Sequence, residues 1–266
     1  MDDGIVTVIR HQSTGDGPLD TAVSRAVLDA VGKGTMGESL EVSATGQILA
    51  FGKQDAGTPG FDAAVDRAEG LRYQSTVRIV GGRAAAFHDA TIRFGWTRPI
   101  DDAASAMADG FARLTRAVVA ALASFGIRGE VGETPGEYCP GKWSVHIAGR
   151  KVMGVGQRLT RTAAHVGGVI VVDGAQRINE VLLPVYGALG LPFDPSVTGS
   201  LSDAMVIPTG DFIDAFVGEL CRGRTVVAGT VPDHLLRVAH DLRSDHDPKA
   251  RRPVCRTSDF ARDSPS

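Results

Sequence analysis

The sequence has few cysteines, little net charge and no long apolar run, and each absence excludes a class of protein. Its three cysteines, Cys139, Cys221 and Cys255, are an odd number at unrelated spacings. They suggest neither a disulfide framework nor a zinc-ligand set. We therefore expect no metal site and a reducing compartment. A net charge of -3 gives no basic field of the kind that nucleic-acid partners require.

Signals for membranes and export are also missing. No apolar run approaches the ~20 residues that a membrane span needs. The first five residues, Met-Asp-Asp-Gly-Ile, contain neither the basic nor the apolar region of a signal peptide. The sequence therefore predicts a cytoplasmic protein with neither nucleic-acid nor membrane partners.

What is present is enough apolar material for a sizeable core, since 43% of the 266 residues are hydrophobic. Apolar residues recur at helical spacing in five segments, and short β-branched or apolar runs bounded by glycine predict strands between them. Together they predict an α/β domain, a mixed sheet flanked by helices, over residues 1–231. From residue 232 to 266 the chain is polar and predicts a disordered tail. The expected helices cover 19–31, 61–69, 103–125, 178–189 and 211–220, and the expected strands 47–52, 76–80, 84–87, 91–94, 144–148, 151–157 and 166–172.

Gly81 and Gly82 join two of the expected strands and are followed by small residues that begin at Ala84. Such a backbone can approach a ligand closely, or it can simply turn beside a crowded core. The segment lacks the Gly-Lys-Ser/Thr pattern and the following helix of a phosphate-binding loop. A P-loop ATPase is therefore not expected.

A thiol and an amine occur together in the middle of the chain. Cys139 lies in a loop flanked by proline and glycine, and Lys151 begins a strand after the turn at Gly149. A thiolate is a good acyl carrier, and a neighbouring ammonium lowers its pKa and binds a developing oxyanion or phosphate. The pair indicates acyl transfer. Each residue also has an ordinary interpretation, as a small buried cysteine or a solvated lysine. His88 and His165 are likewise either structural or catalytic.

The pattern from residue 19 to 221 resembles the superfamily of lipoate-protein ligases, octanoyltransferases and biotin-protein ligases. The resemblance implies a class II synthetase-like fold in which the acyl chain or biotin lies near the double glycine. It also implies that Lys151 binds the acyl carbonyl or acyl-phosphate oxygen. The matching residues are Phe51-Gly52, Arg78, Gly81-Gly82, Ala84 to Asp89, Gly149-Arg150-Lys151, Gly154, Gln157-Arg158 and His165. We take Cys139 and Lys151 as candidate catalytic residues, and Arg78, Gly81, Gly82, Ala84, His88, Gly154 and His165 as candidate substrate-binding residues.

Departures from the superfamily pattern separate its two chemistries. ATP-dependent lipoate ligases typically carry a serine and a third glycine where this chain has Val80 and Arg83, and an Asn-Asp pair where Trp143 and Ser144 begin the segment before the turn. The segment around Cys139, Tyr-Cys-Pro-Gly, is instead similar to the cysteine-dependent octanoyl or lipoyl amidotransferases. The resemblance implies that Cys139 carries the acyl group as a thioester.

Three hypotheses follow. The first is a lipoylation enzyme that needs no cofactor and moves an octanoyl or lipoyl group between acyl-carrier or lipoyl-domain proteins through Cys139. The second is an ATP-dependent lipoate-protein ligase that needs ATP and Mg²⁺, with biotin ligation as a variant. The third is a non-catalytic protein that binds an acyl group or a lipoyl domain.

Overall fold

A large mixed sheet of eight strands forms the centre of the computed structural model, which describes residues 4–10 and 13–251. Its strand order is β11-β1-β2-β6-β10-β9-β8-β7. Strand β1 pairs in parallel with both β11 and β2, and the other neighbours pair antiparallel. The strands are β1 (Ile5–Arg10), β2 (Ser39–Ala44), β6 (Thr91–Pro99), β7 (Glu130–Val131), β8 (Val145–Ile147), β9 (Arg150–Leu159), β10 (Ala163–Val171) and β11 (Thr225–Gly229).

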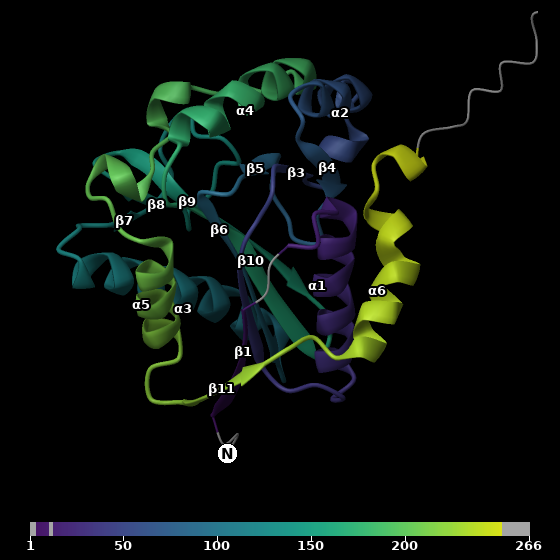
Figure 1. Ribbon diagram of the computed structural model, residues 1–266, viewed down its shortest axis with the longest axis vertical. Coiled ribbons are helices and arrows are strands. Elements are labelled where there is room, and N and C mark those ends of the chain that lie inside the picture. The colour runs from purple at the N-terminus through teal and green to yellow at the C-terminus, as the bar shows by residue number, and fades with distance from the viewer. Residues whose placement is uncertain (1–3, 11–12, 252–266) are drawn as a thin grey trace, which may run out of the picture.

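A second sheet of three strands has the order β4-β3-β5, with β3 (Ile48–Phe51) between β4 (Gln74–Val77) and β5 (Ala85–Phe87). It lies beside the large sheet and beneath helices α2 (Phe61–Gly70) and α4 (Ala175–Leu189) (Figure 1). The segment after β4 leads directly to the double glycine, so this small sheet positions the candidate site.

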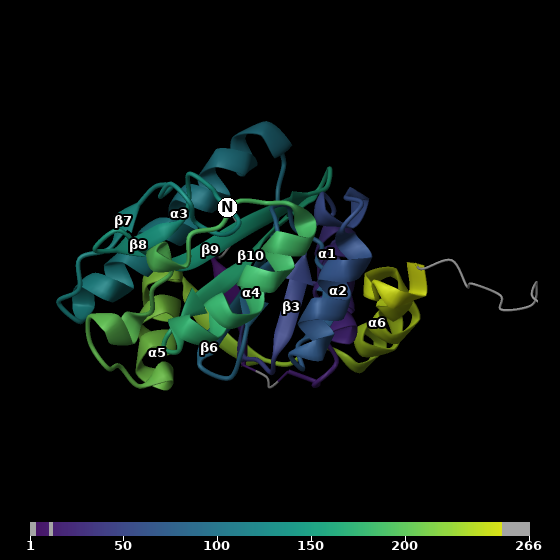
Figure 2. The same cartoon turned by 90° about the horizontal axis from the view of Figure 1, so that it is seen from above.

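Helices cover both faces of the large sheet (Figure 2). The apolar faces of α3 (Ala103–Ser124) and α5 (Thr209–Leu220) pack against one face. On the other face lies α1 (Gly17–Gly32), which contacts β6 and β10. Asp16 caps α1 by accepting a hydrogen bond from the backbone amide of Leu19 at 2.9 Å, as an N-cap carboxylate should. The predicted mixed sheet flanked by helices is confirmed.

The predicted disordered tail is wrong for the part of it that the structure describes. Helix α6 (Asp233–His246) packs along α1, side by side with it in Figure 1, and a short 3₁₀ turn (Lys249–Arg251) follows. Leu235, Ala239 and Leu242 carry the contact at helical spacing, and Arg243 pairs with Asp16 at 2.7 Å. The many charges between these residues hid the apolar face. Residues 252–266, the rest of the expected tail, lie outside the described residues.

No helix within the described residues is long and apolar enough to cross a membrane.

Candidate active site

The loop that carries Cys139 has an unusual backbone. Cys139 has a φ of +44°, in the left-handed region that residues other than glycine seldom adopt. Its amide donates to the hydroxyl of Tyr186 at 2.6 Å, and that hydroxyl donates to the carbonyl of Ala84 at 2.9 Å. A strained conformation at a reactive residue persists only where its surroundings fix it. Tyr186, on α4, fixes this loop against the segment that follows the double glycine.

The thiol of Cys139 lies between two nitrogen donors. Its Sγ accepts hydrogen bonds from Nη2 of Arg78 and from the backbone amide of Arg83, both at 3.2 Å. Gly82 makes this approach possible. A Cβ on Gly82 would lie 2.5 Å from that Nη2 and 2.7 Å from Sγ, and its φ of +100° is itself a glycine conformation. The sequence predicts that a ligand can approach the double glycine closely. In the structure, the group that approaches Gly82 closely is the thiol of Cys139.

These donors change the protonation of the thiol. Burial raises the pKa of Cys139, but the charges of Arg78 and Lys151, with the hydrogen bonds from Arg78 and the Arg83 amide, outweigh it. The net pKa lies below the usual range of a thiol. A larger share of Cys139 is therefore thiolate at neutral pH, and the thiolate is the nucleophilic form.

Lys151 lies beneath this loop and is fully buried. Its ammonium donates to the carbonyl oxygens of Tyr138 at 2.8 Å and Cys139 at 2.9 Å, and to the carboxylate of Glu137 at 3.1 Å. Burial lowers the pKa of Lys151, and the neighbouring Cys139 and Glu137 partly oppose that effect. An ammonium has three donors. All three are used on the loop, so this geometry gives Lys151 the role of holding the backbone of Cys139.

Glu137 is the anion that accompanies Lys151, and no sequence pattern singles it out. Its side chain is buried and accepts hydrogen bonds from five groups. Burial alone would raise its pKa, but the bonds and the charge of Lys151 lower it to about 2. Glu137 is therefore a fixed carboxylate that ties both ends of the loop together. Besides Lys151, its donors are the hydroxyl of Ser144, the ring of His146 and the amides of Thr134 and Gly141.

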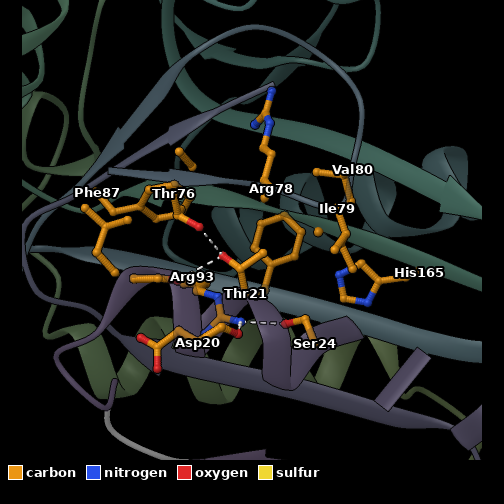
Figure 3. A pocket seen from close by; sticks show the side chains of 16 residues that line it. Asp20, Thr21, Ser24, Thr76, Arg78, Ile79, Val80, Phe87, Arg93 and His165 are labelled. Carbon is orange, nitrogen blue, oxygen red and sulfur yellow. Dashed lines mark hydrogen bonds between the residues drawn. The ribbon is translucent and has the colours of Figure 1, made fainter. Parts of the chain in front are cut away.

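A cavity opens on the other side of Arg78, between α1, the small sheet and β10. It contains about 590 Å³ of space, part of it open to solvent. Arg78, Val80 and Ile79 lie toward one end, and Arg93 reaches Ser24 at the other (Figure 3). Arg78 thus contacts both the thiol and the cavity.

His165 lines this cavity, as the sequence predicts for a substrate-binding residue. Its Nδ1 lies 2.8 Å from the hydroxyl of Thr97. Burial, and then the charge of Arg93, lowers its pKa to about 3. His165 is therefore neutral at physiological pH and offers the cavity an uncharged ring.

The other predicted substrate-binding residues have different positions. Gly81 lies over β9, and a Cβ on Gly154 would lie 3.3 Å from Cε of Lys151, so Gly81 packs beside the strand and Gly154 beside the lysine. Ala84 anchors Tyr186.

His88 is not brought to the site. It follows β5 directly, where Phe87 lines the cavity, and its ring lies against Gly174. Neighbouring residues of an extended chain point to opposite sides.

No group of three or more His, Cys, Asp or Glu side chains in the part of the chain that the structure describes could hold a metal ion.

Comparison with known proteins identifies the family of the chain. A model of the family described as "Lipoyl protein ligase A/B catalytic domain" matches residues 22–220. The chain belongs to this family. It is 27% identical over 224 residues to an octanoyl-GcvH:protein N-octanoyltransferase of Geobacillus kaustophilus, covering 77% of this chain and 79% of that relative. It is 25% identical over 169 residues to a lipoyl-GcvH:protein N-lipoyltransferase of Listeria monocytogenes, covering 60% and 61%. The predicted superfamily and the predicted enzyme class, an acyltransferase of protein lipoylation, are confirmed.

Solved structures share the fold of this lipoyl ligase family member. A lipoate-protein ligase A bound with ATP superposes with a TM-score of 0.74 at 15% identity, covering 91% of this chain and 94% of the other. A putative lipoate protein ligase from Thermoplasma acidophilum with bound lipoic acid gives 0.71 at 15% identity, covering 90% and 95%. At this identity the likeness concerns the fold alone.

Proposed function

We propose that this enzyme transfers an octanoyl or lipoyl group from an acylated protein to a lysine of a lipoyl domain through a thioester on Cys139. The thiolate attacks the acyl carbonyl, the bond to the donor breaks, and the donor's leaving group takes up a proton. The amine of the acceptor lysine then attacks the thioester, forming an amide and releasing the thiol. The names of the curated relatives, which act on octanoyl-GcvH or lipoyl-GcvH, support such a donor.

The observation that carries this proposal is the position of the Cys139 thiol. It lies at 3.2 Å from both Nη2 of Arg78 and the Arg83 amide, and Arg78 also lines the cavity. These two donors stabilise the thiolate, both as the attacking nucleophile and as the group that the acceptor amine displaces. The cavity beyond Arg78 is the place for the acyl chain, with Val80 and Ile79 on its wall.

The ATP-dependent alternative fits these residues less well. It needs the ammonium of Lys151 to meet an acyl-adenylate, but the three donors of that ammonium are used on Glu137, Tyr138 and Cys139. The thiol also occupies the space beside Gly82. The proposed reaction accordingly requires neither ATP nor Mg²⁺. A purely binding protein has no use for a thiol whose pKa is lowered.

The test is the mass of the intact enzyme after incubation with an octanoylated GcvH protein. The proposal predicts an octanoyl adduct that hydroxylamine removes, that Cys139→Ala abolishes and that Cys221→Ala, at the buried thiol after α5, retains. Labelling of a lipoyl domain by lipoate and ATP in Cys139→Ala protein would establish the ligase instead. Binding of the lipoyl domain without either modification would leave the non-catalytic hypothesis.

A further inference from the structure

A second hollow lies beside the active site, and we call it the Arg158 pocket. It contains about 550 Å³ of space, part of it open to solvent, between α1, β9, the segment after β4 and α6. Its charged lining consists of Arg25, Lys53, Arg78, Arg158 and Asp245. Lys53 is exposed, and the three arginines are half-buried. The pocket therefore has three guanidinium-bearing side chains that are each partly exposed.

The charged side chains that line this pocket are mostly positive, whereas the whole protein is negatively charged. Four cations and one carboxylate meet in a chain whose net charge is -3. Arg25 is held by Asp29 at 3.0 Å, and Arg78 by the thiol and a carbonyl. Arg158 has no carboxylate within ion-pair distance among the described residues. Guanidinium groups bind carboxylates through two parallel hydrogen bonds. Arg158 is therefore available to bind a carboxylate of another molecule.

The pocket also has a fixed relation to the reacting atom. Arg78 lines it and donates to Sγ of Cys139 at 3.2 Å. A lysine that attacks a thioester on Cys139 reaches it through a stem of only four carbons. The protein surface around that lysine must then lie against the residues around Cys139, among them Arg78, which also lines the Arg158 pocket.

We propose that the Arg158 pocket docks carboxylates of the acceptor protein that flank its target lysine. This inference rests on the proposed transfer reaction and adds the surface that orients the acceptor. A locally positive pocket on a negatively charged protein attracts an acidic surface in one orientation and repels it elsewhere. One wall comes from α6, which lies beyond the residues that match the family. The docking surface is thus partly a feature of this chain's C-terminal helix.

The test uses charge reversal and an unmodified lipoyl domain as the probe. Binding of that domain to the full-length enzyme, measured by calorimetry without an acyl donor, should weaken roughly tenfold in Arg158→Glu. The matched control is Arg161→Glu, at an exposed arginine in the turn between β9 and β10. It should bind as the wild type does. A lipoyl domain with a carboxylate beside its target lysine changed to arginine should bind Arg158→Glu better than the original domain does.

The two half-reactions separate this inference from the proposed function. With octanoyl-N-acetylcysteamine, a small uncharged thioester donor, Arg158→Glu should form the acyl-enzyme at the wild-type rate, while its KM for the lipoyl domain rises. Equal binding by wild type and Arg158→Glu would overturn the docking proposal, as would an equal loss in Arg161→Glu. So would displacement of inorganic phosphate with no change in lipoyl-domain binding, which would define a small-anion site. Failure to form any acyl-enzyme would instead remove the proposed function, and the binding measurement would still decide the docking proposal.

Discussion

The ammonium of Lys151 donates to the backbone carbonyl of Cys139 at 2.9 Å, from a side chain that is fully buried. The amine is therefore attached to the nucleophile's backbone, and its third donor goes to Glu137. Lys151 and Glu137 form a buried pair whose structural role is to hold a cysteine at positive φ.

Removing both members of this pair should cost less than the sum of removing each one alone. Lys151→Met leaves Glu137 charged and buried, and should lower the free energy of unfolding by about 3–5 kcal/mol. The double variant Lys151→Met, Glu137→Leu should lose less than the sum of its single variants. Urea unfolding at pH 7 measures all three values. Additive losses would show that the two side chains do not act as a pair.

Acid should weaken the contribution of Glu137. Its pKa is lowered from 4.5 to about 2 on folding, so the unfolded chain takes up the proton first. The contribution is complete above about pH 4.5 and is lost as the pH falls toward 2, and it amounts to about 3 kcal/mol. The difference in unfolding free energy between wild type and Glu137→Gln should therefore shrink over this interval. Urea titrations at several pH values measure it, and a constant difference would contradict the account.

Arg78 should control the reactivity of the thiol. Because its charge and hydrogen bond lower the pKa of Cys139, alkylation by iodoacetamide should reach half its maximal rate below the ordinary thiol pKa of about 8.5. Arg78→Gln should move this midpoint upward. Arg161→Gln, away from the thiol, serves as the control. If Arg78→Gln alkylates with the wild-type pH profile, the guanidinium does not stabilise the thiolate.

Two adjacent glycines should respond differently to the same substitution. A Cβ on Gly82 would collide with Arg78 and Sγ of Cys139, whereas a Cβ on Gly81 meets nothing within 4 Å. Gly82→Ala should slow formation of the acyl-enzyme roughly 100-fold, as expected for a misplaced reacting group. Gly81→Ala should retain most of the rate. Rapid-quench mass measurements compare them, and equal rates would show that the close approach at Gly82 is dispensable.

Much of the fold could be predicted because its elements have clear periodicity. The helix expected over 103–125 is α3 (Ala103–Ser124), and the hairpin around Gly149 is β8 and β9. Strand β2 was not predicted, since Ser39–Ala44 includes a buried glutamate, Glu41, and lacks a continuous apolar pattern. Helix α6 was missed because its few apolar residues are spaced among charges.

The sequence predicts which residues of the site lie near one another, but not which contacts they make. The proximity of Cys139 and Lys151 follows from a loop and a strand close together in the chain. The role of Lys151 depends on Glu137, and the anchoring of Cys139 depends on Tyr186, 47 residues away. Such contacts arise from the path of the loop, which no local pattern specifies. His88 was placed at the site by resemblance, although the alternation after Phe87 turns it away.

The proposed mechanism requires that a thioester on Cys139 passes its acyl group to a lipoyl domain. The octanoylated enzyme is isolated from excess donor and mixed with an unmodified lipoyl domain in buffer without ATP. Intact masses of both proteins are then followed in a single turnover. The account predicts that the octanoyl group leaves Cys139 and appears on the lipoyl domain at the same rate. Loss from the enzyme by hydrolysis, with no octanoylated lipoyl domain, would contradict it.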